Sequence, residues 1–258
     1  MKFSIITVTY NAAEFLEKTI LSVLTQSYGN IEYIIVDGAS KDGTLDIIRQ
    51  YESGIAHWIS EADTGLYDAM NKGLALSTGD YVWFINAGDC LYSVDIVSQM
   101  VERIAAYRPK KQAVLGSVLP DILYGETELM DADGKTLGMR RLKAPDNLTW
   151  KSFRWGMLVC HQSFVLKRSL APMFDLKYRY CADIEWCISG MKASKHIFNT
   201  RLTLSRFLEG GMSDKQRKAS LEERYRIMCT HYGTLSTLVM HGWFALRFGF
   251  SKLVGKKQ

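Results

Sequence analysis

Two aspartates stand near the ends of apolar runs, where a carboxylate could act on a ligand. Asp37 follows Tyr33-Ile34-Ile35-Val36, and a carboxylate at the end of a strand can accept hydrogen bonds from a ribose or a base N–H, although it can equally cap a neighbouring turn. Asp89 closes the segment Phe84-Ile85-Asn86-Ala87-Gly88-Asp89. Because Mg²⁺ and Mn²⁺ bind one or two carboxylates together with phosphate oxygens, Asp89 is a candidate metal ligand.

The elements that position these carboxylates are indicated by the first hundred residues, which alternate short apolar runs with longer amphipathic ones. Short continuous apolar runs between helices are typical of strands buried on both faces, as in a parallel βαβ sheet. The expected strands cover 3–8, 33–36, 57–59 and 81–85, and the expected helices 13–25, 44–51, 67–76 and 94–104. Ligands of such sheets bind beyond the carboxyl ends of the strands. The polar residues that follow the four strands are therefore expected to converge on one edge.

The pattern changes after residue 108. Asp131-Ala132-Asp133-Gly134-Lys135 has the composition of a hairpin turn between two strands, 122–129 and 136–142, and this context argues against its Asp-x-Asp as a metal site. The later segments read as a helix over 183–193, a strand over 197–207 and a charged helix over 214–232. We expect a single domain over 1–233, with halves at 1–108 and 109–233, followed by a tail at 234–258.

Composition sets further limits. The chain has 258 residues, of which 47% are hydrophobic and 23% charged, which is ordinary for a globular protein. The net charge is +5, and basic residues crowd from Arg140 to the end, which suggests an anionic partner such as a diphosphate or a membrane surface. Five cysteines without CxxC spacing indicate reduced thiols. Because the first residues also lack a signal-peptide pattern, we expect a cytoplasmic protein.

Two other positions are candidates for substrate contacts. His161 could contact an acceptor or a donor phosphate, but a lone histidine beside a strand is about as often structural. Gly210-Gly211, followed by Ser213 and Lys215, could form a flap that binds a diphosphate through backbone N–H groups and cations. A helix start with exposed basic residues would give the same pattern.

Four blocks follow one another within about ninety residues. They are Ile5-Ile6-Thr7-Val8-Thr9-Tyr10-Asn11, Ile35-Val36-Asp37-Gly38-Ala39-Ser40-Lys41-Asp42-Gly43-Thr44, Asp68-Ala69-Met70-Asn71-Lys72-Gly73 and Asn86-Ala87-Gly88-Asp89. In order and spacing they resemble family 2 glycosyltransferases with the GT-A fold, especially bacterial enzymes that build capsule, colanic acid or other exopolysaccharide. The second half is similar only in patches, chiefly His161-Gln162, Ala182-Asp183 and Gly210-Gly211-Met212-Ser213.

This resemblance implies an α/β protein of the GT-A fold, in which helices flank a mostly parallel nucleotide-binding sheet in the first half. A mixed α+β acceptor half and C-terminal helices follow. The implied activity is inverting transfer of a sugar from a nucleoside diphosphate sugar, expected to be a UDP-sugar, to a hydroxyl of a glycan or lipid-linked acceptor. The implied donor contacts are Thr9, Asn11, Asp37, Asp68, Asn71 and Asn86, with Asp89 on the metal and Asp183 as general base.

The chain departs from the family pattern at one point, since that pattern has carboxylates where this chain has Asn86 and Gly88. A divalent cation, Mn²⁺ or Mg²⁺, is still expected, held chiefly by the diphosphate. With the leaving phosphate neutralised in this way, one base suffices for a single displacement with inversion. Asp183 begins an expected helix, whose dipole favours the ionised form, but an N-cap role fits the same position.

Two other functions remain open. A nucleotidyltransferase acting on sugar phosphates can share an α/β nucleotide-binding half, but it usually grips a triphosphate with a Gly-rich, basic loop, and Thr9-Tyr10-Asn11-Ala12-Ala13 has neither glycine nor cation. A non-catalytic nucleotide-sugar-binding module is the second alternative. Binding of nucleic acid is not expected, because the first half has no basic patch interleaved with aromatic residues.

The tail is apolar from Leu235 to Val254, but His241, Arg247 and Lys252 interrupt it. Charges of this kind within about 20 residues disfavour a membrane span. An amphipathic helix lying on the inner face of the cytoplasmic membrane is expected instead, where it would bring the site to a lipid-linked acceptor. The alternative is that the tail packs on the protein's own second half or on a second subunit.

Overall fold

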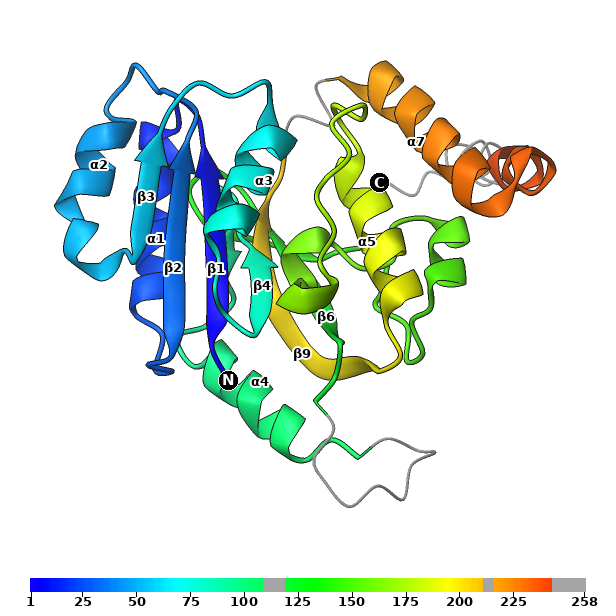
Figure 1. Ribbon diagram of the computed structural model, residues 1–258, viewed down its shortest axis with the longest axis horizontal. Helices are drawn as coiled ribbons and strands as arrows, with labels where there is room; N and C mark the ends of the chain where they lie inside the picture. The colour runs from blue at the N-terminus through cyan, green and yellow to red at the C-terminus, as the bar shows by residue number, and fades with distance from the viewer. Residues whose placement is uncertain (109–118, 211–215, 243–258) are drawn as a thin grey trace.

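A mixed β-sheet lies between two layers of helices in the computed structural model, which describes residues 1–108, 119–210 and 216–242 (Figure 1). The strands are β1 (Phe3–Thr9), β2 (Ile31–Asp37), β3 (His57–Ser60), β4 (Tyr81–Phe84), β5 (Cys90–Leu91), β6 (Ile122–Met130), β7 (Thr136–Met139), β8 (Phe164–Lys167) and β9 (Ile197–Leu208). The helices are α1 (Ala13–Leu24), α2 (Thr44–Gln50), α3 (Leu66–Leu76), α4 (Ile96–Ala105), α5 (Ala182–Ala193) and α7 (Arg217–Tyr232).

The sheet has the strand order β3-β2-β1-β4-β8-β6-β9-β5 among the described residues. Strands β1 to β4 are parallel, as the sequence predicts. Strand β8 is antiparallel to both β4 and β6, so β6 and its parallel neighbour β9 run in the same direction as the first four strands. The mostly parallel sheet expected from the sequence is therefore confirmed. The insertion of β8 between β4 and β6 and the short strand β5 were not expected.

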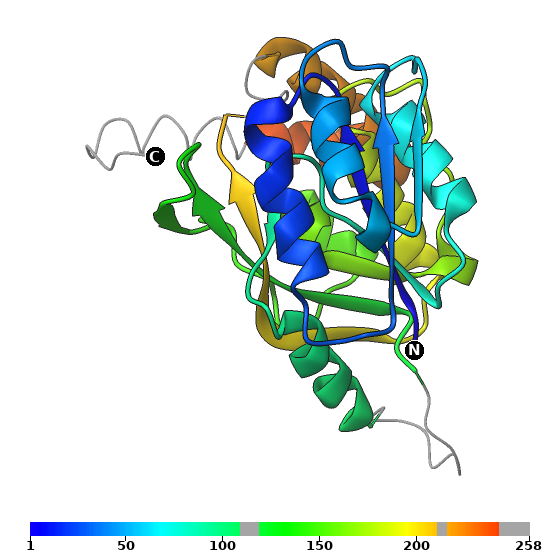
Figure 2. The same ribbon diagram turned by 90° about the vertical axis from the view of Figure 1, so that its left-hand side faces the viewer.

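Each face of the sheet buries its own hydrophobic cluster. Ile6 and Val8 of β1 belong to the cluster that contains side chains of α3, α5 and α7. Phe3 and Ile5 of the same strand belong to the cluster that contains side chains of α1, α2 and α4. Figure 2 shows α1 and α2 in front of the sheet. Burial on both faces explains why the central strands are continuously apolar rather than alternating.

The hairpin predicted around residues 131–135 joins β6 to β7. The N–H of Lys135 donates to a carboxylate oxygen of Asp131 at 2.8 Å, and Gly134 has a φ of 85°, which favours glycine. The side chain of Asp131 is therefore used by the turn, which confirms the hairpin predicted from the sequence. In Figure 2 the hairpin and the end of β9 project side by side from the molecule.

The tail is described only as far as residue 242, and residues 234–242 are helical. Thr237 is buried and Met240 packs against the cluster that contains α7. Leu235, Leu238 and Val239 are exposed, at 78%, 53% and 65%. Across the described ranges, no helix is both long enough and apolar enough to cross a membrane. The remainder of the expected membrane-docking segment lies outside the described residues.

Candidate active site

The carboxyl ends of the first strands meet at one edge of the sheet. Thr9 at the end of β1 is in register with Asp37 at the end of β2, and Asp37 is in register with Ser60 at the end of β3. The N–H of Ala87 donates to the carbonyl of Val8 at 3.1 Å, so the segment after β4 continues along the same edge. The sheet thus brings together the polar segments that the sequence placed after each strand.

Asp37 is completely buried and holds the turn that follows β2. Its carboxylate accepts hydrogen bonds from the N–H of Ser40 at 2.9 Å and from the hydroxyl of Ser60 at 2.7 Å, and the Ser40 hydroxyl donates as well. The turn-capping role is thus seen directly, and contact with a nucleobase or ribose stays a prediction. Thr9 is a different case, because its buried hydroxyl has no hydrogen-bond partner in the described chain.

Asn11 lies beside this turn in a left-handed conformation, with a φ of 46°. Its side-chain oxygen accepts from the N–H of Lys41 at 2.9 Å, and its own N–H donates to Ser40 at 2.8 Å. These two contacts join the loops after β1 and β2. The side chain of Asn11 is exposed at this edge, so its predicted donor contact remains sterically open.

The two predicted donor residues of α3 make different contacts. Asp68 accepts hydrogen bonds from the N–H and hydroxyl of Thr64 at 2.9 and 3.1 Å, which fixes the loop before the helix. Asn71 is buried, and its amide exchanges hydrogen bonds of 3.0 and 2.7 Å with the backbone of Phe174. Asn71 therefore supports the segment that carries Phe174. The donor contacts predicted for both side chains remain untested.

Asp63 was not singled out from the sequence, although it lies at the same edge. Its carboxylate packs against Gly38, where a Cβ would come within 2.5 Å of an Asp63 oxygen. Any side chain at position 38 would therefore push Asp63 away from the end of β2. The carboxylate also accepts from the N–H of Gly65 at 2.9 Å. Asp63 follows the short edge strand β3 by three residues, and in the sequence this position looks like any polar residue of a loop.

Asp89 lies just beyond the end of β4 and is 5% exposed. Its carboxylate accepts from the amide of Gln162 at 2.8 Å and from the N–H of Leu208, at the end of β9, at 3.0 Å. Burial raises the pKa of Asp89 to about 6, because the two hydrogen bonds compensate only part of the lost hydration. A cation beside this carboxylate would favour its ionised form.

Asp183 stands in the first turn of α5. The N-cap of this helix is Cys181, so Asp183 does not have the N-cap role that the sequence left open. One carboxylate oxygen accepts from the Tyr67 hydroxyl at 3.0 Å, and the other lies 3.0 Å from Nδ1 of His161. Burial would raise the pKa of Asp183, but the contacts with His161 and Tyr67 hold it below its usual range. With 15% of its side chain exposed, this carboxylate has the ionised form and the access that a general base needs.

His161 and Gln162 are consecutive residues of a short 3₁₀ helix, His161–Ser163, and each binds one of the two carboxylates. Nδ1 of the His161 ring faces Asp183. The other ring nitrogen of His161, Nε2, lies 3.4 Å from the side-chain amide nitrogen of Asn86. The side-chain oxygens of Asn86 and Gln162 are buried without a hydrogen-bond partner within the described ranges. Unpaired buried acceptors of this kind mark places where a ligand can bind.

The described residues contain no group of three or more His, Cys, Asp or Glu side chains that could hold a metal ion. The Asp89 carboxylate can nevertheless be one ligand of a hard cation, because such a cation needs only one or two protein carboxylates when phosphate oxygens supply the other ligands. A single carboxylate thus fits a cation that takes its other ligands from a diphosphate, as expected from the sequence. Ser213, the remaining predicted substrate contact, lies outside the described residues.

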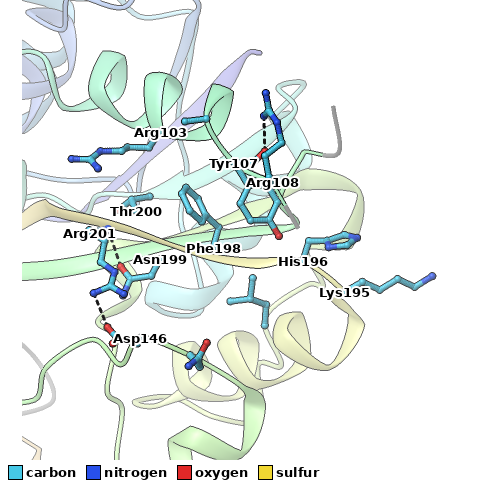
Figure 3. A pocket seen from close by; sticks show the side chains of 13 residues that line it. Arg103, Tyr107, Arg108, Asp146, Lys195, His196, Phe198, Asn199, Thr200 and Arg201 are labelled. Atoms are coloured by element: carbon cyan, nitrogen blue, oxygen red, sulfur yellow. Dashed lines mark hydrogen bonds and ion pairs between the residues drawn. The ribbon is translucent and has the colours of Figure 1, made fainter. Parts of the chain in front are cut away.

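A hollow in the described part of the chain lies elsewhere. It measures about 950 Å³ and is lined by residues at the start of β9, the end of α4 and the loop around Asp146 (Figure 3). Ile197 of β9 is in register with Ile122 of β6, and Ile122 pairs with Leu166 of β8. Because Leu166 pairs with the start of β4, this hollow lies at the edge of the sheet opposite to the carboxyl ends of the parallel strands. Arg201 and Asp146 form an ion pair of 2.8 Å within it. The hollow contains none of the predicted site residues.

Comparison with known proteins identifies the class. The family model for glycosyl transferase family 2 matches residues 4–170, and the chain belongs to this family. An uncharacterised glycosyltransferase of Mycobacterium tuberculosis is 33% identical over 190 residues, covering 72% of this chain and 67% of the relative. The glycosyltransferase TuaG of Bacillus subtilis, putatively assigned to teichuronic acid biosynthesis, is 35% identical over 153 residues, which cover 57% of this chain and 54% of that protein.

Solved structures show the same fold at lower sequence identity. S. aureus TarS 1–349 in complex with UDP-GlcNAc has a TM-score of 0.66 at 17% identity, covering 88% of this chain and 64% of that one. A mannosyltransferase from Pyrobaculum calidifontis, in complex with GDP-Man and Mn²⁺, has a TM-score of 0.56 at 17% identity and covers 99% of this chain and 76% of that one. The expected GT-A fold is confirmed.

Proposed function

We propose that this glycosyltransferase moves a sugar from a UDP-sugar to a hydroxyl of a glycan or lipid-linked acceptor, with inversion at the anomeric carbon. The observation that carries the proposal is the ionised, partly exposed Asp183, held by Tyr67 and His161 near the carboxyl edge that carries Asp89. UDP is favoured as the leaving group because TarS, a structure of the same fold, is solved with UDP-GlcNAc and with UDP.

In this mechanism Asp183 accepts the proton of the acceptor hydroxyl as that oxygen attacks the anomeric carbon from the face opposite the diphosphate. The bond between the anomeric carbon and the diphosphate oxygen breaks in the same step, so a single base suffices. Tyr67 and His161 fix both oxygens of the carboxylate and thereby its direction. The donated hydrogen bonds also keep Asp183 ionised before the reaction.

The donor is held at the carboxyl edge of the sheet. Asp89 would bind a divalent cation shared with the diphosphate. When bound, such a cation neutralises the charge that develops on the leaving phosphate. Thr9, Asp37 and the neighbouring Asp63 are the side chains proposed to face the nucleobase and ribose.

A role in cell-surface polysaccharide synthesis is supported by the relative TuaG, putatively assigned to teichuronic acid biosynthesis. The location that we propose for this role is the inner face of the cytoplasmic membrane. The helix at 234–242 exposes Leu235, Leu238 and Val239. Because Leu238 lies three residues and Val239 four residues after Leu235, the three side chains share one helical face. Such an apolar face suits shallow insertion among lipid headgroups. Membrane docking would bring Asp183 to a lipid-linked acceptor.

The direct test compares Asp183→Asn with wild type on a panel of UDP-sugars and nucleoside triphosphates. We expect the wild type to turn over UDP-sugars and not triphosphates, and we expect Asp183→Asn to have a kcat lower by about 10²-fold or more with unchanged UDP affinity. Glu185→Gln, two residues further along α5, is the matched control and should retain turnover. Retention of configuration in the product, read by NMR, would overturn the mechanism, and turnover of triphosphates alone would favour a nucleotidyltransferase.

A further inference from the structure

Glu223 of α7 holds the chain at the point where it enters α5. Its carboxylate accepts hydrogen bonds of 2.8, 2.7 and 3.1 Å from the N–H groups of Arg179, Tyr180 and Cys181. One carboxylate oxygen accepts from Arg179, and the other accepts from both Tyr180 and Cys181. A carboxylate bound by three consecutive N–H groups fixes the direction of the backbone as well as its position. These three hydrogen bonds form the Glu223 clamp.

The start of α5 has no cap of its own. Cys181 stands at the N-cap position, and its side chain makes no capping hydrogen bond. The first N–H groups of a helix lack partners within the helix, and an N-cap side chain usually accepts from one of them. Here the acceptor comes from α7, 42 residues beyond Cys181 in the chain (Figure 1). The Cys181 thiol also contacts α7, since it donates to the carbonyl of Ser220 at 3.3 Å.

Asp183 follows this clamped segment by two residues. Tyr67 and His161 hold the two oxygens of its carboxylate, which fixes the direction of the side chain. Its backbone, however, moves with the first turn of α5. Ala182, between the clamp and Asp183, is completely buried, so a displacement at Cys181 would be passed on to Asp183. The Glu223 clamp therefore sets the position from which the Asp183 side chain projects.

Other contacts keep α7 in place without the clamp. Ile227 and Met228, in the second half of α7, are buried in the cluster that contains α5. Near the end of the helix, the hydroxyl of Tyr232 donates to the carbonyl of Trp150 at 2.5 Å. Since α7 is attached through these residues as well, the particular effect of Glu223 lies at the start of α5.

We propose that Glu223 is a positioning residue for the transfer reaction and that it acts through Asp183. The inference rests on the proposed function, in which Asp183 is the general base. A base must lie within hydrogen-bond reach of the acceptor hydroxyl, and a misplacement of about 1 Å can lower a rate by about 10²-fold. The Glu223 clamp keeps the start of α5 where Tyr67 and His161 can both reach the carboxylate of Asp183.

The first test is Glu223→Gln, measured by UDP release from the UDP-sugar that the wild type turns over. An amide of the same size has one acceptor oxygen, and its NH₂ group would face N–H donors, so at least one of the three hydrogen bonds is lost. We expect kcat to fall about tenfold or more with unchanged UDP affinity. Glu222→Gln, at the exposed neighbouring position of α7, removes the same charge and should keep the wild-type kcat. A wild-type kcat in Glu223→Gln would overturn the proposal.

Hydrogen exchange tests the clamp without turnover. The amides of residues 179–183 should exchange about tenfold faster in Glu223→Gln than in the wild type, because exchange follows local opening. Tyr232→Phe removes a hydrogen bond at the other end of α7 and should change neither this exchange nor kcat. Unchanged exchange in Glu223→Gln would refute the clamp. An equal loss of kcat in Tyr232→Phe would mean that any loosening of α7 lowers the rate, which would refute a specific role of Glu223.

A double-mutant cycle tests whether Glu223 acts through Asp183. In the Asp183→Asn background, Glu223→Gln should cause no further loss of kcat, because the base whose position it sets is already gone. The same fold-loss in both backgrounds would overturn the proposal. Wild-type turnover in Asp183→Asn would refute the proposed base itself, whereas loss of turnover there with full turnover in Glu223→Gln would refute only the positioning role. Glu223→Asp, which keeps the carboxylate at a shorter reach, should retain more of kcat and replaces Glu223→Gln in each comparison if that variant does not fold.

Discussion

The hydroxyl of Tyr67 donates a 3.0 Å hydrogen bond to the carboxylate of Asp183, although the two residues are 116 positions apart in the chain. Tyr67 is 5% exposed, and its ring stacks on Phe174 at a centroid distance of 5.5 Å. Burial and the charge of Asp183 raise the pKa of this phenol well above its ordinary value. The hydroxyl therefore stays protonated and donates to Asp183 throughout the physiological pH range.

Tyr67→Phe should move the acidic limb of the kcat profile to higher pH. The base must be ionised, so the rate falls as the pH drops through the pKa of Asp183, and loss of one stabilising donor raises that pKa. A hydrogen bond to a charged group contributes about 1.5 kcal/mol or more, so a shift of about 1 pH unit is expected. The phenylalanine ring keeps the stacking on Phe174. An unchanged limb would show that Tyr67 serves only packing.

Asp89→Asn should stabilise the folded protein at neutral pH. The pKa of Asp89 is raised to about 6 by burial, so the folded state binds a proton more tightly than the unfolded state. Stability therefore falls as the pH rises from about 4 to about 6, by up to about 3 kcal/mol. The variant lacks this cost. Gln162, whose side-chain oxygen is unpaired, can turn its amide to accept a hydrogen bond from the NH₂ group that the substitution introduces.

Urea unfolding of both proteins in the absence of metal and nucleotide measures this effect. We expect the variant to be more stable at pH 7.5 and the difference to vanish near pH 4. A constant difference across the whole range would mean that the Asp89 carboxylate titrates alike in the folded and unfolded states. The argument from burial would then be wrong.

The same variant should lose metal-linked binding of nucleotide. If the cation is shared between Asp89 and the diphosphate, Mn²⁺ should strengthen UDP binding by the wild type and have little effect on the affinity of Asp89→Asn. Calorimetric titration with and without Mn²⁺ measures both affinities. Asp133→Asn, in the hairpin turn, is the matched control and should behave like the wild type. Full Mn²⁺ dependence in the Asp89 variant would move the metal away from this carboxylate.

The exposed face of the helix at 234–242 should bind membranes. Replacing Leu235, Leu238 and Val239 together by Ser removes its apolar surface, so we expect sedimentation with anionic vesicles to be lost while UDP affinity is kept. Leu137→Ser, which removes a leucine of 49% exposure from β7, should leave vesicle binding intact. Equal sedimentation of the triple variant and the wild type would exclude this face as the docking surface.

The sequence predicted which residues lie at the carboxyl edge of the sheet, but it did not predict the hydrogen bonds that their side chains make there. Asp37 and Asp89 follow buried parallel strands, and the carboxyl ends of such strands must meet, so their shared edge could be inferred without a structure. Asp68 and Asn71 stand three residues apart on α3 and were expected to face the same ligand. That shared role stays a prediction. The contact of Asn71 with the backbone of Phe174 could not be foreseen, because a buried segment must pair its polar groups and only the folded chain shows which segment passes there.

The support of the two key carboxylates was not predictable from local pattern. Tyr67 lies among apolar residues at helical spacing and reads as core, while its partner Asp183 comes more than a hundred residues later. Gln162 was seen only as part of a resembling patch, and its contact with Asp89 depends on β8 entering the sheet between β4 and β6. Pairings of such high sequence separation leave no periodic signal.

The hydrogen bond from the N–H of Leu208 to Asp89 limits how far the chain can fold while it is being synthesised. The two residues are 119 positions apart. At about 5–20 residues per second, a ribosome needs about 6–24 s to make the intervening chain. Strands β1 to β4 can pair within this interval, since their partners are already made, but the loop that carries Asp89 waits for β9. A nascent chain arrested before residue 208 would therefore hold a formed parallel sheet with an unfinished site at its edge.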